Sequence, residues 1–435
     1  MKNPKHSPAT PPTRHHFILL GQLLKLIPRS MLERAAAESG VAAKARTYSP
    51  WSHVGAMIFV HLAHALSLND VCDWLRLKAR AIAAFGLTPP SRNNLSHANK
   101  TRNAAFVQTL FWRTLEHLQR AEPGFGTRRP GGGGKRLLHR FKVRIHAVDS
   151  SVLELVANCL DWAKHRRRKA AAKLHLRLGL GNFLPSFAIV DTAGEHDNKR
   201  AREVCASLEA GEVVIFDKAY VDFLHLHDLD GRGVQWVTRA KENMRYRRVR
   251  NLTVPKDSRI IKDQIIALKG AKWQDIKGRT LRRVEAWVEV DGKERVMVFL
   301  TNNLSWSAGS VCDLYRARWD IEVFFKQVKQ TLKLSGFLGY SANAIRWQVW
   351  TALLVYVPLD GLGALSLSKR LLRFAAHLSL WSHSFTRLVA VVRAAMWERL
   401  DLLGLLRSYG TAGGSFTLLG APHAAWLPGL EPAHT

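Results

Sequence analysis

Apolar residues recur every three or four positions from His16 to about Leu118, and this spacing predicts a helical N-terminal region. Ser49 and Pro50 are predicted to begin one of these helices, because serine can cap a first turn and proline fits the position after the cap. Ser67 is predicted to cap the next helix. The first part of the chain therefore suggests an all-helical domain.

A short polar helix is predicted from Arg92 to Arg102, with Ser91 as its cap and a Gly/Pro turn before it. Together with the preceding helix it has the proportions of a helix-turn-helix. Its polar residues are either a surface that recognises DNA ends or an ordinary solvated helix face. The candidates for DNA contact are Arg92, Asn94 and Lys100.

The pattern changes after residues 121–139, which are rich in glycine, proline and arginine and are typical of a linker. Beyond them apolar and polar positions alternate, which predicts half-buried strands. The predicted strands run from about 143 to 149, 174 to 180, 183 to 190 and 213 to 216. The last has four apolar residues in a row, as in a strand buried on both faces. Asp291-Gly292 between two alternating runs predicts a hairpin.

Charge changes this picture of a helical domain followed by a mixed one. The 435 residues contain 65 Lys and Arg against 34 Asp and Glu, a formal net charge of +31. Such a surplus favours a polyanionic partner, because basic side chains displace the counterions condensed on phosphates. With 14 Trp and 47% hydrophobic residues, the chain has the composition of a folded enzyme and not of a short chromatin-like basic protein. Nucleic acid is the expected partner.

The remaining composition predicts a cytoplasmic protein without a membrane span. The basic N-terminus lacks the apolar core of a signal peptide. The most apolar stretch, 347–367, contains Pro358 and Asp360 and is predicted to form core helices. The cysteines are too far apart for a metal or disulfide framework, so reduced thiols are expected. They are Cys72, Cys159, Cys205 and Cys312.

Three acids carry the candidate chemistry. Asp149 and Asp217 are each predicted to follow a strand, where α/β enzymes collect catalytic groups. Either one alone is more often a turn or capping residue. Glu322 belongs to a stretch, 306 to about 334, that is predicted to be one helix.

That helix carries a stripe of four polar residues. At about 100° per residue, Tyr315, Arg318, Glu322 and Lys329 fall within roughly 80° of one another. The apolar residues beside the stripe are Leu314, Ile321, Phe324, Phe325, Val328 and Leu332. They would anchor the helix to the core. An acid with two bases on a helix is usually a surface ion-pair network, but this stripe matches phosphodiester chemistry. Convergent carboxylates can hold two Mg²⁺ ions, and Arg and Lys can hold phosphates.

The motif Tyr315-x2-Arg318-x3-Glu322-x6-Lys329 resembles the signature of the insertion sequence 4 family of bacterial DDE transposases. Several other segments are similar to that family. They are His146 to Ser150, Lys173 to His175, Asp217 to Tyr220, Leu300 to Asn303, Phe337 to Gly339, and Asn343 to Ile345 with Gln348. The resemblance covers roughly residues 16–360.

This resemblance implies an α/β fold with an RNase H-like core, a β-strand insertion, an all-α domain before the core and helices after it. The expected parts are a disordered tail (1–14), a helical DNA-binding domain (15–120), a linker (121–139), a core (140–365) with its insertion at about 230–303, and a basic helical C-terminal region (366–435).

The resemblance also implies roles for residues. Asp149, Asp217 and Glu322 would be catalytic and would ligate two Mg²⁺ ions, for which Mn²⁺ substitutes. Tyr315 and the basic residues would contact double-stranded DNA. The expected basic contacts are Arg318, Lys329, Lys326, Lys218 and the run Arg166, Arg167 and Arg168. That run is either a solvated charge cluster or a loop on phosphates.

The implied reaction is nicking at the element's ends to free a 3′-OH, excision through a hairpin, and joining to target DNA by at least a dimer. The family also uses a Trp on a flipped base. Trp236, Trp287 and Trp306 are equal candidates for that role. The alternatives are a non-catalytic regulator derived from a transposase and a nuclease that cuts without joining. The presence of all three acids argues against the first, and the Tyr-Arg-Glu-Lys stripe against the second.

Overall fold

The computed structural model describes residues 14–41, 48–122, 125–126, 140–155, 170–192, 197–254, 256, 258–269, 280–290, 292–331 and 337–361. Several features predicted above lie outside these residues. They are the N-terminal tail, most of the linker, Cys159, the basic run at 166–168 and the C-terminal region 366–435.

The N-terminal part is helical, as its periodicity predicted. Its helices are α1 (Arg14–Lys25), α2 (Arg29–Glu38), α3 (Pro50–Ala63), α4 (Leu68–Leu77), α5 (Ala79–Ala83), α6 (Arg92–Thr101) and α7 (Ala105–Ala121). The predicted caps are confirmed. The Ser49 hydroxyl accepts from the Ser52 amide, and Ser67 forms a capping box with Asp70. Ser91 caps α6 through the Asn94 amide.

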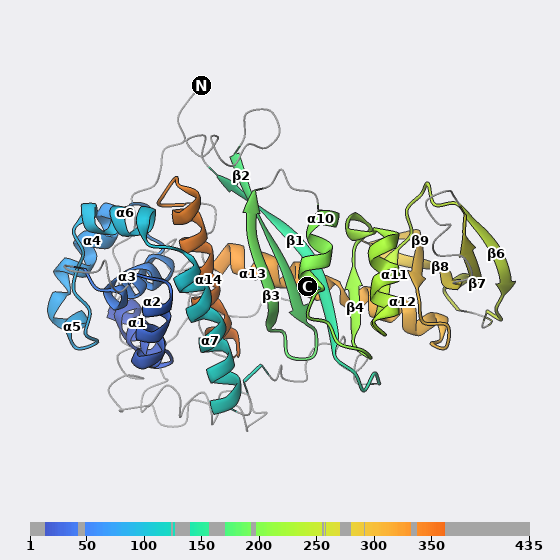
Figure 1. Cartoon of the computed structure of the whole chain (residues 1–435), viewed down its shortest axis with the longest axis horizontal. Coiled ribbons are helices and arrows are strands. Elements are labelled where there is room, and N and C mark those ends of the chain that lie inside the picture. The colour runs from blue at the N-terminus through green and yellow to red at the C-terminus, as the bar shows by residue number, and fades with distance from the viewer. Residues whose placement is uncertain are drawn as a thin grey trace, which may run out of the picture. The chain divides into compact units, whose positions relative to one another are not determined.

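The strands form one nine-stranded sheet within the described part of the chain, in the order β3-β2-β1-β4-β5-β9-β8-β7-β6 (Figure 1). Their bounds are β1 (Ile145–Leu155), β2 (Ala170–Gly179), β3 (Pro185–Thr192), β4 (Val213–Phe216), β5 (Gln235–Arg239), β6 (Tyr246–Asn251), β7 (Ile260–Leu268), β8 (Thr280–Val290) and β9 (Lys293–Thr301). β4 and β5 run parallel to β1, and the other pairings are antiparallel.

Two strand predictions are confirmed in detail. All four residues of β4 are buried, in agreement with its unbroken apolar run. β8 and β9 form the hairpin expected at Asp291-Gly292, with Val290 opposite Lys293 and Gly292 at a φ of 71°. Only glycine adopts that φ without strain. Residues 235–239 form β5, which pairs with β4 in the main part of the sheet. The antiparallel strands that follow β5 along the chain begin with β6, at Tyr246.

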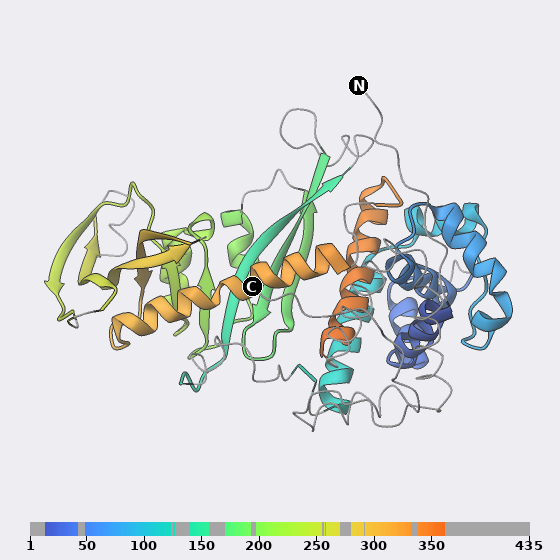
Figure 2. The same ribbon diagram turned by 180° about the vertical axis from the view of Figure 1, so that it is seen from behind.

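Helices cover both faces of the sheet. α10 (Asp197–Val204) and α11 (Phe223–Gly231) lie on one face, and α12 (Ala308–Ala317) and α13 (Trp319–Thr331) cross the other (Figures 1 and 2). The fold is therefore mixed α/β. Val148, Phe216, Leu229 and Trp236 belong to the buried core under α10 and α11.

The last described helix, α14 (Ala342–Gly361), packs against α3, α6 and α7 of the N-terminal part. Asn343 receives a hydrogen bond from the Ala104 amide and donates to the carbonyls of Asn99 and Arg102. Trp347 is fully buried and donates to the same Arg102 carbonyl. The family-like segment around Asn343 thus joins α14 to the N-terminal helices.

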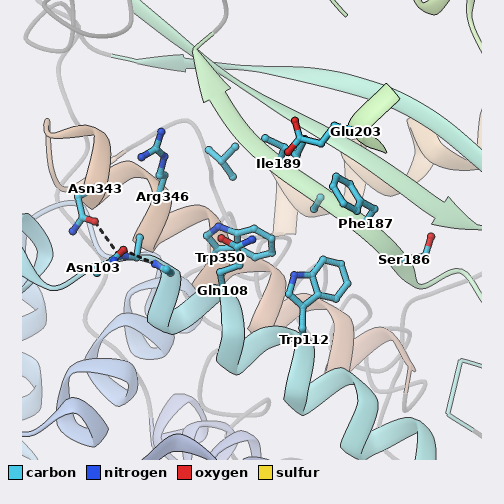
Figure 3. A pocket seen from close by; sticks show the side chains of 14 residues that line it. Asn103, Gln108, Trp112, Ser186, Phe187, Ile189, Glu203, Asn343, Arg346 and Trp350 are labelled. Atoms are coloured by element: carbon cyan, nitrogen blue, oxygen red, sulfur yellow. Dashed lines mark hydrogen bonds between the residues drawn. The ribbon is translucent and has the colours of Figure 1, made fainter. Parts of the chain in front are cut away.

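A cavity of about 380 Å³ lies between β3, one edge of the sheet, and helices α7 and α14 (Figure 3). Its lining includes Phe187 and Ile189 from β3 and the rings of Trp112 and Trp350 from the two helices. This edge of the sheet therefore faces other parts of the protein, which is one way in which proteins protect a free strand edge.

No single helix in the described ranges is long and apolar enough to cross a membrane. Only α3 and α4 taken together satisfy length and composition, with a bend of 104° between them.

Candidate active site

Asp149 and Asp217 lie side by side on the sheet. The parallel pairing of β1 and β4 ends at Val148 opposite Phe216, and each acid is the next residue of its strand. Successive side chains alternate between the faces of a sheet. Val148 and Phe216 belong to the core on the α10 side, so both acids face α12 and α13.

The position of Asp149 corrects one prediction. β1 does not end at Asp149 but continues to Leu155, because β2 keeps pairing with it beyond the end of β4. Asp217 does follow β4 directly, as expected.

The predicted single helix of residues 306–334 is broken at Arg318, which lies between α12 and α13. The Arg318 amide donates to the Tyr315 carbonyl at 3.1 Å, and the Ile321 amide donates to the Arg318 carbonyl at 3.1 Å. These short-range bonds tighten one turn, and the chain then continues as a helix. The predicted anchoring is confirmed for five of its six residues, since Leu314, Ile321, Phe324, Phe325 and Val328 are buried. Leu332 lies outside the described residues.

The four polar residues of the stripe all contact β1, β4 or each other. Tyr315 donates to Asp217 Oδ1 at 3.0 Å. Arg318 bridges two acids, with 3.0 Å to Asp149 Oδ2 and 2.6 Å to Glu322 Oε1. Lys329 donates to the carbonyl of Val152 at 2.6 Å. Tyr315 and Arg318 of this helical segment thus connect to all three predicted acids on one face of the sheet.

Burial controls the charge of this cluster. It raises the pKa of Asp149 from 3.8 to about 6, and the neighbouring charges of Glu322 and Asp217 add to the rise while Arg318 opposes it. Burial also acts to lower the pKa of Arg318, but Tyr315, Asp149 and Glu322 outweigh it and raise the pKa above its ordinary value. A cation bound beside Asp149 would favour its ionised form and oppose this rise.

The donor set suits divalent cations by its chemistry, because carboxylate oxygens are the ligands that Mg²⁺ prefers. Within the described residues no group of three His, Cys, Asp or Glu side chains is close enough to hold a metal ion. Arg318 lies between Asp149 and Glu322 and supplies the positive charge there. A cation bound by the three acids would have to replace at least part of this arginine's contacts.

A second polar cluster lies behind Asp149, on the α10 side of the sheet. Ser150 donates to Asp197 Oδ1 at 2.7 Å, and Lys173 lies 3.3 Å from the same oxygen. His175 Nδ1 is 3.2 Å from the Tyr220 hydroxyl and 3.6 Å from Asp197 Oδ1. The cluster therefore ties β1, β2, α10 and the turn after Asp217 to one another.

The sequence did not predict this cluster, although four of its five members stand in the family-like segments around Asp149, Lys173 and Asp217; they are Ser150, Lys173, His175 and Tyr220. Strand alternation was the available signal, because a residue next to an inward acid must face the other side. Burial lowers the pKa of His175 to about 4, so the ring is neutral. A neutral ring can act as a hydrogen-bond spacer between β2 and Tyr220.

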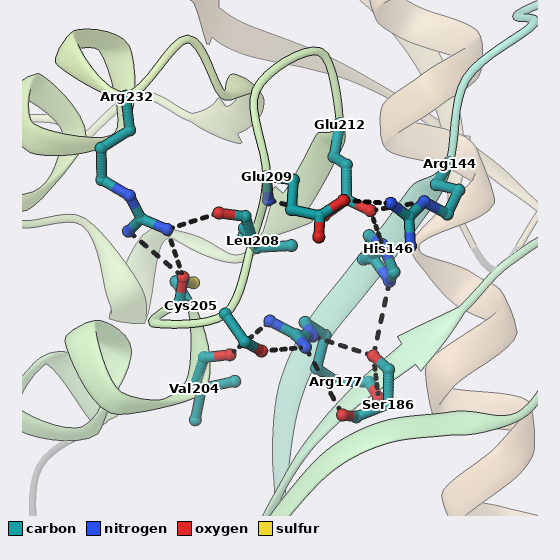
Figure 4. A network of polar contacts seen from close by, with 11 residues as sticks. Arg144, His146, Arg177, Ser186, Val204, Cys205, Leu208, Glu209, Glu212 and Arg232 are labelled. Carbon is teal, nitrogen blue, oxygen red and sulfur yellow. Dashed lines mark hydrogen bonds and ion pairs between the residues drawn. The ribbon is translucent and has the colours of Figure 1, made fainter. Parts of the chain in front are cut away.

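A third set of polar contacts fixes the other ends of the same strands (Figure 4). Buried Arg177 of β2 donates to the Ser186 hydroxyl at 2.8 Å and to the Val204 carbonyl at 3.0 Å. Arg144 Nε lies 2.7 Å from Glu212 Oε1, just before β4 begins. These contacts thus hold the four strands β1 to β4 in register at the ends that lie away from the acids.

The remaining predicted DNA contacts are dispersed over the surface. Arg92, Asn94 and Lys100 are exposed on α6, and Lys326 is exposed on α13. Lys218 is half-exposed and lies 3.4 Å from Glu242.

The three candidate tryptophans differ in exposure. Trp236 is 1% exposed in the core, whereas Trp287 is 44% exposed on β8. Trp306 is half-buried, and its carbonyl accepts from Arg282. Trp287 is thus the candidate whose ring is open to solvent.

Models of known protein families match two parts of the chain. The family model of the transposase DDE domain matches residues 141–357, which span the sheet, all three acids and most of α14. A second family model, a domain of unknown function (DUF4372), matches residues 15–88.

Three curated relatives are transposases. A putative transposase, y4zB, of Sinorhizobium fredii is 27% identical over 73% of this chain and 81% of its own length. A probable transposase for insertion sequence element IS5377 of Geobacillus stearothermophilus is 27% identical over 51% of this chain and 57% of its own length. Transposase InsG for insertion sequence element IS4 of Escherichia coli is 21% identical over 42% of each chain.

The matched domain and the relatives define the class as the DDE transposases, enzymes of DNA cleavage and strand transfer. Within that class the chain belongs to the insertion sequence 4 family. Membership in this class implies dependence on a divalent metal and DNA as the partner.

Proposed function

We propose that this protein binds the ends of an insertion element, nicks them to free a 3′-OH and joins that hydroxyl to target DNA, with Asp149, Asp217 and Glu322 as its catalytic acids. One observation carries the proposal. Two acids are adjacent on parallel strands, and a single arginine connects one of them to the third acid. Carboxylates from separate elements converge in this way where an enzyme binds cations for phosphodiester chemistry.

The core that carries the acids is proposed to be RNase H-like. The strand order β3-β2-β1-β4-β5, with β4 and β5 parallel to β1, supports this assignment. β6 to β9 extend the sheet between Asp217 and Glu322, which supports the β-strand insertion implied by the family resemblance.

Asp149, Asp217 and Glu322 are proposed to hold two Mg²⁺ ions, for which Mn²⁺ would substitute. When bound, the ions would activate the attacking oxygen and stabilise the leaving one. Tyr315 orients Asp217 through its hydroxyl, and Ser150 orients Asp149 through its amide, which donates at 2.8 Å. Arg318, released from its acids, would hold a phosphate by its two-pronged donor geometry.

DNA is proposed to reach the acids along α13, with Lys326 and Lys329 on phosphates. The exposed face of α6 with Arg92, Asn94 and Lys100 is proposed to read the element's ends as the second helix of a helix-turn-helix. Excision through a hairpin and a dimeric synaptic complex are proposed from family membership.

The test uses the full chain, its own terminal repeats and Mn²⁺ or Mg²⁺. The wild type should nick at the 3′ ends and join them to a plasmid, and Glu322→Gln should abolish both reactions while it still binds the ends. Glu116→Gln, on an exposed α7 side chain, is the matched control and should remain active. Strand transfer by Glu322→Gln at the wild-type rate would remove this residue from the catalytic set.

A further inference from the structure

The outermost strand of the sheet, β6, carries a row of arginines with no assigned role. We define the β6 arginine strip as Arg245, Arg247, Arg248 and Arg250, all of which are exposed. Figure 1 shows β6 at the end of the sheet opposite to β3. Both edge strands pair with a single neighbour, but the β3 edge faces α7 and α14 across a cavity, whereas the main contacts of β6 among the described elements are with β7 alone.

No acid within the described residues forms an ion pair with the strip. Arginines on β8 and just before β7 do have acidic partners. They are Arg259 with Glu294, Arg282 with Asp263, and Arg283 with Glu285. On the neighbouring strand β7, the residues opposite the strip are Ala267, Ile266 and Ile265, which carry no charge. Among the described residues, Asp263, Glu285 and Glu294 are therefore already paired with other arginines, and the charge of the strip is left for an external anion.

The geometry of β6 argues against a protein strand as its partner. The register shifts between Arg248 and Arg250, which leaves Val249 unpaired and 47% exposed. Bulges and charged side chains are the usual devices that stop a further strand from adding to an edge. Several arginines in a row instead match the repeated phosphates of a nucleic acid backbone, which guanidinium groups bind in a two-pronged way.

The distance to the acids favours DNA that is continuous with the reacting strand. β6 is five strand spacings from β4, or about 24 Å along the sheet at about 4.8 Å per spacing. At about 3.4 Å per base pair, this corresponds to roughly seven base pairs of duplex. A duplex whose reacting phosphate is at Asp217 therefore extends far enough to reach the strip.

We infer that the β6 arginine strip binds the backbone of the target duplex, about seven base pairs from the joining point. This inference rests on the proposed function of the acids. Arginines on a solvated strand edge hold phosphates without reading bases. Such contacts suit target DNA, whose sequence is not fixed, better than the terminal repeats, which need a reading element in a groove.

The test compares three triple variants of the full chain. Arg247→Gln/Arg248→Gln/Arg250→Gln removes charge from the strip, and the corresponding triple Lys variant keeps it. The matched control is Arg76→Gln/Arg113→Gln/Arg120→Gln, three helical arginines that each pair with an acid.

The first measurement is the salt dependence of binding to a 40-base-pair duplex of arbitrary sequence. The Gln triple should flatten the slope of log K against log salt by about two to three units, because each lost phosphate contact removes about 0.9. The Lys triple and the helical control should keep the wild-type slope. An unchanged slope in the Gln triple would overturn the inference, even if the protein neither cuts nor joins DNA.

The second measurement separates target DNA from the element's ends. With pre-cut ends, joining to a plasmid at 150 mM salt should fall about tenfold or more in the Gln triple, while nicking of uncut ends stays at the wild-type rate. Equal losses in nicking and joining would show that the strip holds the ends, and the inference would fail. If the wild type neither nicks nor joins, the proposed function fails, and the salt slope still decides whether the strip binds DNA.

Discussion

Arginine serves two different purposes in two regions of one sheet. Beside β1 and β4, Arg318 is partly buried with an 11% exposed side chain and is bonded to Asp149 and Glu322. On β6 and directly before it, the four arginines of the strip are exposed without an acidic partner among the described residues. The net charge of +31 does not distinguish these regions. The two regions differ in whether acids neutralise the arginines: the strip at β6 is proposed to bind DNA, whereas Arg318 connects two of the acids that are proposed to be catalytic.

The largest change in stability is expected from the substitution Arg318→Met. Without metal, removal of the guanidinium leaves Asp149, Asp217 and Glu322 to repel one another. Breaking a buried ion pair costs about 3–5 kcal/mol, and the loss here should be smaller, because the Glu322 side chain is 36% exposed. In EDTA the Tm should therefore fall by several degrees, and Mn²⁺ should raise it more in the variant than in the wild type.

Arg283→Met provides the matched control for that result. Arg283 is also 11% exposed and pairs with Glu285, but it lies on β8 away from the acids. Its loss should lower the Tm without any added rescue by Mn²⁺. Equal Mn²⁺ responses in the two variants would show that Arg318 does not stand in for a cation.

The substitution Asp149→Asn is expected to raise the Tm, by less than Arg318→Met lowers it. The pKa of Asp149 is raised from 3.8 to about 6, so the folded state disfavours its ionised form. Above pH 6 the ionised acid destabilises the metal-free fold, and this penalty disappears as the pH falls toward 4. The Asn variant should thus melt a few degrees higher than the wild type at pH 8 in EDTA, with no difference near pH 4, and should lack strand transfer.

The contrasting variant is Asp263→Asn. Asp263 is 2% exposed and pairs with Arg282, so the neutral Asn side chain leaves this buried arginine without a charged partner. Its Tm should fall at pH 8. A lower Tm for Asp149→Asn as well would mean that Arg318 stabilises Asp149 more than burial destabilises it.

Much of this site could be predicted from the sequence. The stripe of Tyr315, Arg318, Glu322 and Lys329 depended only on helical spacing, which the one-residue break at Arg318 leaves nearly intact. The end of β1 could not be predicted, because it depends on β2, a partner distant in sequence. The ion pair between Arg318 and Asp149 was also hidden, since nothing local specifies which acid a helix will face after packing.

The same limit applies to the β6 arginine strip. Its residues stand in the sequence as a basic run, yet their meaning depends on which acids are already paired across β7 and β8. The cluster behind Asp149 was missed for a similar reason, because Ser150, His175 and Asp197 meet only after three elements have packed.

The smallest effect, and the sharpest test of that cluster, is expected from His175→Asn. Burial lowers the pKa of His175 from 6.5 to about 4, so neutral histidine contributes stability above pH 6.5 that is lost as the pH falls toward 4. The variant lacks this titration, and its Tm should depend less on pH over that range. If the cluster positions Asp149 and Asp217, the Mn²⁺ concentration for half-maximal nicking should also rise a few-fold.

His225→Asn separates positioning from stability. Burial likewise lowers the pKa of His225 to about 4, but this residue lies on α11, and among the described residues its ring nitrogens make no hydrogen bond to the cluster. Its variant should share the altered acid dependence of the Tm and keep the wild-type Mn²⁺ requirement. A raised Mn²⁺ requirement in both variants would mean that the cluster contributes only to packing. A rise in His175→Asn alone would show that the cluster on the α10 face positions the acids on the opposite face of the sheet.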